Sequence, residues 1–269
     1  MMPIERIQGK TMTHRMPTTP RMNATCAALV LLLLGGSAGP ALAQDGGPAA
    51  PFAAGEVLTY RGVSGRFGRF GRAIMRVDGP MDVRGVQALQ LSFDFKGRVG
   101  IFKVEQRGRS WITQSDMASL RYEQRERSPL GSKNEEVDIF PDTGRWVGSD
   151  GKTGETVCEH PLDELSFIYY IRSLPLKDGE EYFLVHHFDA QRNPVTLRAI
   201  RREITTVPAG EFATVVVEMY VRDERVSSMR FFLTDDEARI PVRIESSAPW
   251  VGSTRLLLES VSGAKVAAR

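Results

Sequence analysis

Strict alternation of apolar and polar residues at 89–95 is the feature that most constrains the fold of this chain. The segment reads Leu-Gln-Leu-Ser-Phe-Asp-Phe. Successive side chains of a β-strand point to opposite faces, so this pattern places Leu89, Leu91, Phe93 and Phe95 on one face of a sheet. The segment therefore predicts a β-strand with one buried face.

The alternation continues along the chain, with turns between the runs. It recurs at 195–199 and 239–244, and less cleanly at 229–233, where Phe232 interrupts it. Turn-forming residues separate the apolar runs at 78–80, 141–144, 150–151 and 208–210. This spacing favours an antiparallel meander.

Two further strand features are informative. Val215, Val216 and Val217 follow one another without a polar residue, which predicts a strand that is covered on both faces. Pro241 lies inside an alternating run, and proline cannot donate a hydrogen bond to a neighbouring strand. We therefore expect either an edge strand or a β-bulge at Pro241.

One segment, 161–173, has helical periodicity instead. It begins with Pro161, carries Asp163 near its start and Arg172 near its end, and is followed by Pro175, as the geometry and dipole of a helix favour. Its apolar residues recur at helical spacing: Leu162, Leu165, Ile168 and Tyr169. The sequence thus predicts a mainly antiparallel all-β fold, a curved sheet or half-open barrel, with one central amphipathic helix packed on the sheet or plugging a barrel end.

Residues 1–43 predict a cleavable signal peptide. Arg15 and Arg21 precede an uncharged apolar run, and Ala41-Leu42-Ala43 suits signal peptidase. No cysteine stands directly after Ala43, so we expect a periplasmic product without a lipid anchor and without an integral membrane segment after processing. The alternative is an uncleaved anchor, since 24–43 reaches the roughly 20 residues that span a bilayer.

Setting that segment aside changes the charge of the protein. Residues 1–43 hold four basic and one acidic residue, of 35 and 33 in the whole chain, so the remainder has a net charge near −1. No basic field then indicates nucleic-acid binding or an anionic membrane surface. The remaining length suits a single β-rich domain at 51–260, between a flexible start at 44–50 and a flexible tail at 261–269.

Few residues indicate catalysis or metal binding. The chain has no Gly-x-Ser-x-Gly elbow, and we predict no catalytic residue, no cofactor and no metal site. Cys158 is the single cysteine after the predicted cleavage, so no internal disulfide can form. Cys158 and His160 could form a metal pair, but zinc or copper would need further ligands. We favour a buried thiol and a turn histidine.

Two charged runs have plain structural interpretations. The run 235–237, Asp-Asp-Glu, lacks the alternating ligand positions and the glycine of a calcium loop, so we expect a solvated hairpin turn. The run 65–72 interleaves arginines with Phe67 and Phe70. We expect its phenylalanines to anchor a glycine-rich bend while the arginines stay in water.

Short motifs occur in a fixed order over nearly all of the chain after residue 51. They are Phe52, Gly55-Glu56-Val57-Leu58-Thr59-Tyr60, Pro161-Leu162-Asp163, Ser166, Tyr169-Tyr170-Ile171-Arg172, Leu174-Pro175-Leu176, Gly179, Val207-Pro208-Ala209-Gly210-Glu211-Phe212, Asp235-Asp236 and Arg239-Ile240-Pro241-Val242-Arg243-Ile244. Together they resemble an exported bacterial family, domain of unknown function 3108. The resemblance implies a soluble, periplasmic, β-rich protein and no known reaction.

The layout is also similar to that of periplasmic lipoprotein carriers, whose half-open barrels hold acyl chains beneath a helical lid. One helix covers only part of the concave apolar face of a curved sheet, so a ligand cavity would remain. We expect six residues to bind the ligand: Tyr60, Leu91, Phe93, Trp111, Tyr169 and Arg172. The alternative places the aromatic residues in the core, makes Asp163 a helix-start charge and pairs Arg172 with an acid of a strand.

The hypothesis is therefore a periplasmic, non-enzymatic binding or carrier protein for a lipid, a lipoprotein or another apolar or amphipathic envelope molecule. Two alternatives belong to other classes. One is an envelope hydrolase that uses carboxylates such as Glu56 or Asp163 as acid and base, which would require two carboxyl groups in an open cleft. The other is a structural partner of another envelope protein, which a large exposed apolar patch would indicate.

Overall fold

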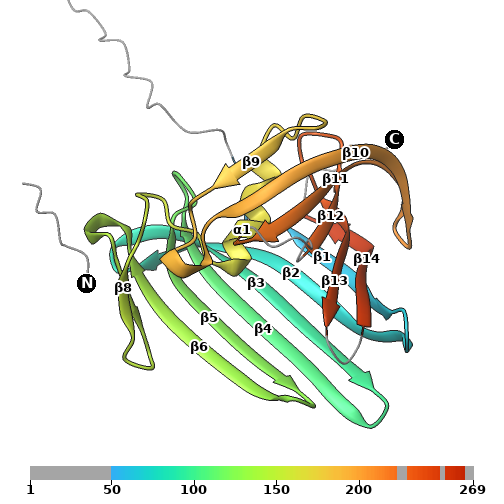
Figure 1. Cartoon of the computed structure of the whole chain (residues 1–269), viewed down its shortest axis with the longest axis horizontal. Helices are drawn as coiled ribbons and strands as arrows, with labels where there is room; N and C mark the ends of the chain where they lie inside the picture. The colour runs from blue at the N-terminus through green and yellow to red at the C-terminus, as the bar shows by residue number, and fades with distance from the viewer. Residues whose placement is uncertain (1–49, 223–228, 249–251, 264–269) are drawn as a thin grey trace, which may run out of the picture. The chain divides into compact units, whose positions relative to one another are not determined.

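The computed structural model describes residues 50–222, 229–248 and 252–263, all within one compact unit, Ala43–Arg269. The predicted signal peptide and all but the last residue of the predicted flexible start lie outside the described residues. The strands of the described residues form one antiparallel sheet of 14 strands that does not close, with one described α-helix inside its curve (Figure 1). The predicted fold class is confirmed.

The elements follow one another along the chain in a simple order. The strands are β1 (Val57–Ser64), β2 (Gly68–Val83), β3 (Val86–Val99), β4 (Phe102–Thr113), β5 (Ser119–Ser128), β6 (Gly131–Phe140), β7 (Arg145–Gly148), β8 (Thr153–Glu155), β9 (Glu181–Leu184), β10 (Val195–Val207), β11 (Gly210–Val221), β12 (Met229–Thr234), β13 (Pro241–Ala248) and β14 (Gly252–Ser262). The helix is α1 (Glu164–Tyr170), and short 3₁₀ turns are η1 (Pro141–Thr143), η2 (Ile171–Ser173) and η3 (Ala190–Arg192).

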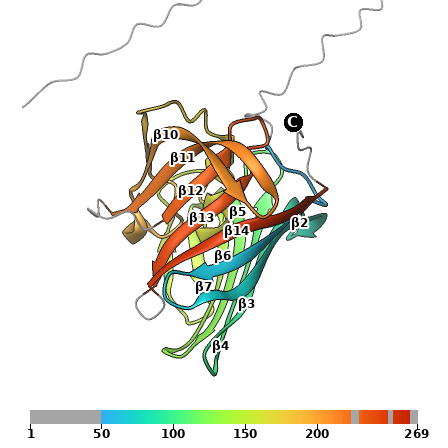
Figure 2. The same ribbon diagram turned by 90° about the vertical axis from the view of Figure 1, so that its right-hand side faces the viewer.

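Two meanders build the sheet. Strands β1 to β8 pair successively in one direction, and β9 to β14 pair successively in the other, until β14 pairs with β1. The edges are β8 and β9. Figure 2 shows how β10–β14 curve across from β2–β7, so that the sheet wraps partly around α1. The result is a half-open barrel in which the helix packs on the first meander through β3 and β4.

The alternation at 89–95 has the predicted consequence. The segment lies in β3, where Leu89, Leu91 and Phe95 are buried and Phe93 is half-buried on the same face. The prediction for the valine run is also confirmed, because all three valines of 215–217 are fully buried in β11.

The region around Pro241 contains a bulge. Phe232 pairs with Arg243 while Leu233 pairs with Pro241, so one residue of β13 is left without a direct partner. Strand β13 lies between β12 and β14 and is not an edge. Of the two expectations for Pro241, the bulge is therefore the one that the structure contains.

The turn predicted at 78–80 is wrong. Strand β2 continues through this segment to Val83, and its register with β3 shifts between Asp78 and Met81. Gly79 has a φ of +124°, which glycine adopts without a steric penalty. Two residues of β2 therefore oppose one residue of β3 in a bulge, and the chain reverses at Arg84 and Gly85.

The helix begins at Glu164, directly after its N-cap residue. Asp163 is the N-cap and accepts hydrogen bonds from the backbone N–H groups of Leu165 and Ser166. The α-helix is thus shorter than the predicted segment 161–173, and η2 completes its C-terminal end. The interpretation of Asp163 as a helix-start charge is confirmed, and α1 packs on the concave side of β3 and β4.

Three glycines on adjacent strands let one aromatic ring lie directly on the backbone of the sheet. Gly62 pairs with Gly71, and Gly71 pairs with Gly97. A Cβ on Gly71 would lie 2.8 Å from Phe95 Cε2 and 2.7 Å from the Lys96 carbonyl oxygen. The missing side chains therefore make room for the Phe95 ring, which forms part of the wall of the cavity described next.

The predicted tail at 261–269 begins as part of the sheet. Strand β14 continues through Ser262, and Val261 pairs with Leu58. Residues 264–269 lie outside the described residues.

Candidate functional site

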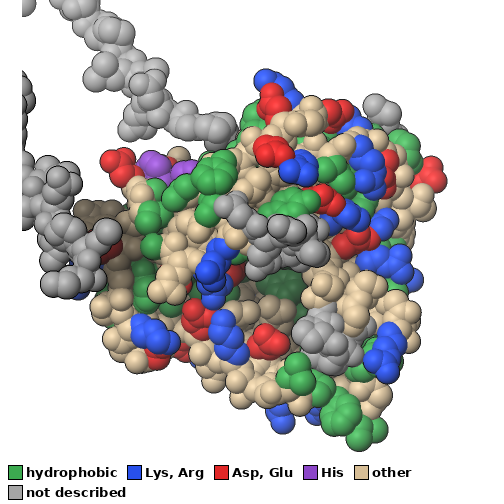
Figure 3. Space-filling view, in the orientation of Figure 1, with side chains coloured by type: hydrophobic (Ala, Val, Ile, Leu, Met, Phe, Trp, Pro, Cys, Tyr) green, Lys and Arg blue, Asp and Glu red, His purple; other side chains and the backbone are tan. Residues whose placement is uncertain are grey.

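A cavity of about 410 Å³ lies between the concave face of the sheet and α1. Figure 3 shows a hollow with apolar side chains at its floor, between the positions of β4 and β13 in Figure 1. Most of its lining is apolar, from four walls: Phe70, Phe93 and Phe95 on β2 and β3, Leu165 and Ile168 on α1, Met229 on β12, and Ile244 and Leu256 on β13 and β14. Its volume lies in the range of small-molecule sites, about 300–1,000 Å³.

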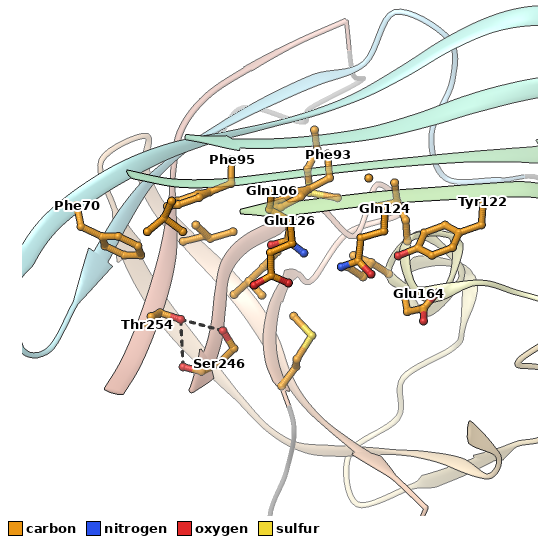
Figure 4. A pocket seen from close by; sticks show the side chains of 18 residues that line it. Phe70, Phe93, Phe95, Gln106, Tyr122, Gln124, Glu126, Glu164, Ser246 and Thr254 are labelled. Atoms are coloured by element: carbon orange, nitrogen blue, oxygen red, sulfur yellow. Dashed lines mark hydrogen bonds between the residues drawn. The ribbon is translucent and has the colours of Figure 1, made fainter. Parts of the chain in front are cut away.

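Polar side chains gather on one part of the wall. Gln106 on β4 and Gln124 and Glu126 on β5 point into the cavity (Figure 4). On the facing wall, the Ser246 and Thr254 hydroxyls are 2.8 Å apart across the β13–β14 pair. The cavity is therefore amphipathic, with amide, carboxylate and hydroxyl groups beside an aromatic and aliphatic surface.

The charge of the lining is one-sided. Glu126 and Glu164 border the cavity, and no Lys or Arg side chain does so among the described residues. Lys133 stands opposite Glu126 in the β5–β6 register, but its ammonium lies 2.6 Å from a Glu135 carboxylate oxygen and 3.5 Å from Gln124 Oε1. A ligand in the cavity would therefore meet acceptors and negative charge.

Glu164 is held in a specific orientation by its neighbours. Arg192 donates to Glu164 Oε1, and His187 Nε2 lies 3.7 Å from the same oxygen. Burial raises the pKa of Glu164, but the contacts with His187 and Arg192 outweigh burial and bring the pKa below its ordinary value. The carboxylate is therefore ionised at neutral pH, and its buried Oε2 has no hydrogen-bond partner among the described residues.

Asp163 fastens α1 to the sheet behind the cavity. Its side chain is fully buried and accepts hydrogen bonds from the Ser110 hydroxyl at 2.5 Å and the Ser119 hydroxyl at 2.7 Å, besides the two backbone donors of the helix. Burial raises the pKa of Asp163 to about 6, although the Ser110 and Ser119 hydroxyls and the Ser166 backbone N–H act in the opposite direction. Asp163 thus positions the helix that forms one wall.

This raised pKa predicts a pH dependence of stability. Because the folded-state pKa of Asp163 lies above the unfolded value of about 3.9, the folded state binds the proton more tightly. The contribution of Asp163 to the free energy of unfolding is present in full below pH 4 and is lost as the pH rises through about 6. We expect a loss of about 2–3 kcal/mol over this range, measured by urea unfolding at each pH.

Asp163→Asn should remove this component, while Asp142→Asn, in an exposed turn, should retain it. The quantity to compare is the change in free energy of unfolding between pH 4 and pH 7. An identical change in the wild type and in Asp163→Asn would contradict the assignment.

The six residues predicted to bind a ligand do not lie together. Phe93 borders the cavity. Leu91 is fully buried in the core. Trp111 is half-buried and follows the inward-facing Ser110 on β4, so it points to the opposite face, where the Arg121 guanidinium lies 5.5 Å from its ring centroid.

The other three, Tyr60 on β1, Tyr169 on α1 and Arg172 on η2, form a buried cluster. The Tyr60 hydroxyl donates to the Pro241 carbonyl at 2.9 Å, and the Tyr169 ring packs edge-on against Phe52 with centroids 4.9 Å apart. Arg172 Nη1 and Nη2 donate to the two oxygens of Glu56 at 2.6 and 2.9 Å. Both charged side chains are about 1–2 % exposed. Arg172 thus pairs with an acid that directly precedes β1.

Several lining residues were missed from sequence. Gln106 and Gln124 were not singled out because polar residues at inward positions weaken the alternation of β4 and β5. The available signal was the two-residue spacing of Val104, Gln106 and Gly108, and of Tyr122, Gln124 and Glu126. Phe70 was expected only to anchor a bend, yet it packs against Phe95 in the cavity wall with ring centroids 5.2 Å apart.

The other chemically suggestive residues have structural surroundings. Cys158 is partly buried, with Sγ 3.9 Å from the His186 carbonyl oxygen, and His160 Nδ1 lies 3.4 Å from Asp116. Among the residues with described positions, no three His, Cys, Asp or Glu side chains form a metal-binding group. Asp236 accepts from the backbone of Ala238, which confirms a hairpin turn between β12 and β13. Within the same residues, no helix has the length and apolar character needed to cross a bilayer.

Comparisons with known proteins bear on the fold and the family. A β-barrel-like protein of domain of unknown function DUF1849 from Brucella abortus is 10 % identical, with 77 % of this chain and 96 % of that chain covered and a TM-score of 0.51. A DUF1089 family protein from Pseudomonas aeruginosa is 12 % identical, with 63 % and 87 % covered and a TM-score of 0.36. Curated proteins give no match. The family described as "Protein of unknown function (DUF3108)" matches residues 57–259, from β1 into β14. The motifs and the match agree: this chain belongs to the DUF3108 family.

Proposed function

We propose that this protein is a non-enzymatic binding or carrier protein for an apolar or amphipathic molecule of the cell envelope. The observation that supports the proposal is the unfilled cavity between sheet and helix. A sheet that needed the helix only for stability would close against it, because protein interiors pack to the density of organic crystals. Here Gly108 lines the cavity without a side chain that could fill it, and Gly62, Gly71 and Gly97 hold the Phe95 ring back against the sheet.

The lining favours a particular class of ligand. An apolar body would contact the phenylalanines and the aliphatic residues, and its polar end would meet Gln106, Gln124 and Glu126. With two carboxylates and no cation among the described lining residues, the cavity disfavours an anionic headgroup. We therefore propose a neutral or positively charged amphiphile with hydrogen-bond donors. Arg172 would not bind the headgroup, since Glu56 already occupies its guanidinium.

The proposed compartment is the periplasm, reached through cleavage of residues 1–43 and without a lipid anchor. This part of the proposal rests on the basic lead, the apolar run and the alanines before Gln44. Intact-mass spectrometry of protein recovered from a cell-envelope extract tests it. Cleavage predicts the mass of a chain whose first residue lies near Gln44. A mass that includes the apolar run would contradict it.

Ligand binding is tested first by native mass spectrometry of the exported protein, followed by extraction and identification of the bound lipid. The headgroup preference is then measured with dodecanol, dodecylamine and dodecanoate, which have the same alkyl chain length and differ in headgroup charge. We expect the alcohol and the amine to bind at least about tenfold more tightly than the carboxylate, which corresponds to about 1.4 kcal/mol. Absence of any bound lipid and of any binding would contradict the carrier function. Equal binding of all three would contradict the headgroup assignment alone.

The geometry gives no support to Glu56 and Asp163 as the acid and base of a hydrolase. Glu56 is bound by both terminal nitrogens of Arg172, and Asp163 accepts from two hydroxyls and two backbone N–H groups. Neither carboxylate borders the cavity. Both are therefore engaged in holding the helix and the start of β1 in place.

A further inference from the structure

Three hairpin ends expose apolar side chains at the same end of the sheet. We define the hairpin tips as residues 65–69, 98–103 and 127–133, which join β1 to β2, β3 to β4 and β5 to β6. Their exposed apolar residues are Phe67 (42 %), Ile101 (86 %), Phe102 (54 %) and Leu130 (71 %). Apolar side chains with this exposure do not contribute to the core of the protein.

The sheet register places the hairpin tips side by side. In the β2–β3 pair, Gly71 next to the first tip stands opposite Gly97 next to the second. In the β4–β5 pair, Glu105 next to the second tip stands opposite Arg127 of the third. Neighbouring strands are about 4.8 Å apart, so β2 to β5 bring the tips within a few strand widths. The β3–β4 and β5–β6 hairpins end together at the lower side of Figure 1, and Figure 3 shows apolar side chains gathered where the β3–β4 hairpin ends.

The hairpin tips are also strongly basic. They contain six basic residues and no acidic residue: Arg66, Arg69, Arg98, Lys103, Arg127 and Lys133. Arg69 lies 3.8 Å from Glu259, and Lys133 contacts Glu135. The other four have no ion-pair partner among the positions that the structure describes.

The turns at the opposite end of the same strands lack this excess of positive charge. There the β2–β3, β4–β5 and β6–β7 connections and their flanking residues carry Asp82, Asp116 and Asp142 together with Arg84 and Arg145. The near-neutral net charge of the domain therefore conceals a local excess of positive charge at the hairpin tips. The expectation that the domain has no basic field is correct for its net charge. It is wrong for the end of the sheet that carries the hairpin tips.

We propose that the hairpin tips bind the surface of an anionic lipid bilayer. Apolar side chains on hairpin ends can enter the headgroup region, while neighbouring arginines and lysines meet the negative surface. The four apolar residues are distributed over separate tips and interleaved with cations, which suits a bilayer better than a flat apolar protein interface. This surface goes beyond the ligand cavity and does not depend on it.

The position of the cavity is consistent with such docking. Phe70, Val104 and Glu126 border the cavity, and each directly adjoins a hairpin tip in sequence, next to Arg69, Lys103 and Arg127. A protein bound through the tips would therefore hold one end of its cavity near the lipid headgroups.

Vesicle binding by the exported protein tests the proposal. Sedimentation with phosphatidylcholine vesicles that contain about one third phosphatidylglycerol is compared with phosphatidylcholine alone. We expect binding to the anionic vesicles that weakens as salt is raised, because salt screens exposed charges. The variants I101S/F102S/L130S and R66Q/R98Q/K103Q/R127Q should each weaken binding about tenfold or more.

Matched controls carry equivalent changes elsewhere on the surface. F183S/I204S removes apolar side chains that are 64 and 65 % exposed on β9 and β10, and R145Q/K152Q removes exposed cations of β7 and its turn. Both should bind vesicles like the wild type, and all variants should keep the same melting temperature. No binding of the wild type to either vesicle would overturn the proposal and favour a protein partner, and full binding by both tip variants would also overturn it.

Discussion

Arg172→Met is expected to lower the free energy of unfolding by about 3–5 kcal/mol. Arg172 and Glu56 are about 1–2 % exposed and share two hydrogen bonds, and Arg172 also donates to the carbonyls of Pro51 and Ala238. Removing the guanidinium would leave the Glu56 carboxylate buried without its countercharge. Urea unfolding monitored by circular dichroism measures the change.

Two comparisons make this prediction specific. Replacing both partners, in E56L/R172M, should restore most of the lost stability, because it removes the uncompensated charge. Arg125→Met breaks an exposed pair with Glu136, whose side chains are 60 and 37 % exposed, and should change the free energy of unfolding by less than about 1 kcal/mol. A small effect of Arg172→Met, or a double variant as unstable as the single one, would refute the structural role of the pair.

Gln106→Trp is expected to weaken ligand binding by at least about tenfold, because the indole would occupy the cavity that the ligand needs. Gln106 borders the cavity and makes no side-chain hydrogen bond with another described residue, so its replacement breaks no contact of the fold. Binding is measured by displacement of the extracted lipid or of dodecanol, and folding by the melting temperature.

The neighbouring residue provides the control. Arg107 follows Gln106 on β4, is exposed, and faces the opposite side of the sheet. Arg107→Trp adds the same side chain one position away and should leave ligand binding unchanged. If both variants bound ligand like the wild type, the cavity would not be the binding site.

Local signals in the sequence were reliable where residues within a few positions of one another decide the structure. Alternation at 89–95 predicted β3, and the periodicity of 161–173 predicted the helix, although Asp163, expected in its first turn, is the N-cap. The turn at 78–80 was wrong for a related reason. Asp, Gly and Pro favour both a chain reversal and a bulge, and the pairing of β2 with β3 over its whole length decides between them.

The binding residues could not be chosen in the same way. Alternation indicates which side chains face inward, but not how far along each strand the helix covers them. Leu91 and Tyr60 face inward, and they became core because the helix, through Tyr169 among others, and the N-terminal Phe52 pack against this part of the sheet. Phe93, two residues further along β3 than Leu91, lies in the part that remains uncovered.

The sequence by itself therefore determined the all-β class, the central helix and the family, because these depend on periodicity and on short ordered motifs. Only the tertiary structure decided which inward-facing residues line the cavity, that Arg172 pairs with Glu56, and that basic residues collect at one end of the sheet. The physical reason is that these features arise from the curvature and register of 14 strands. They bring together residues that are far apart in the chain.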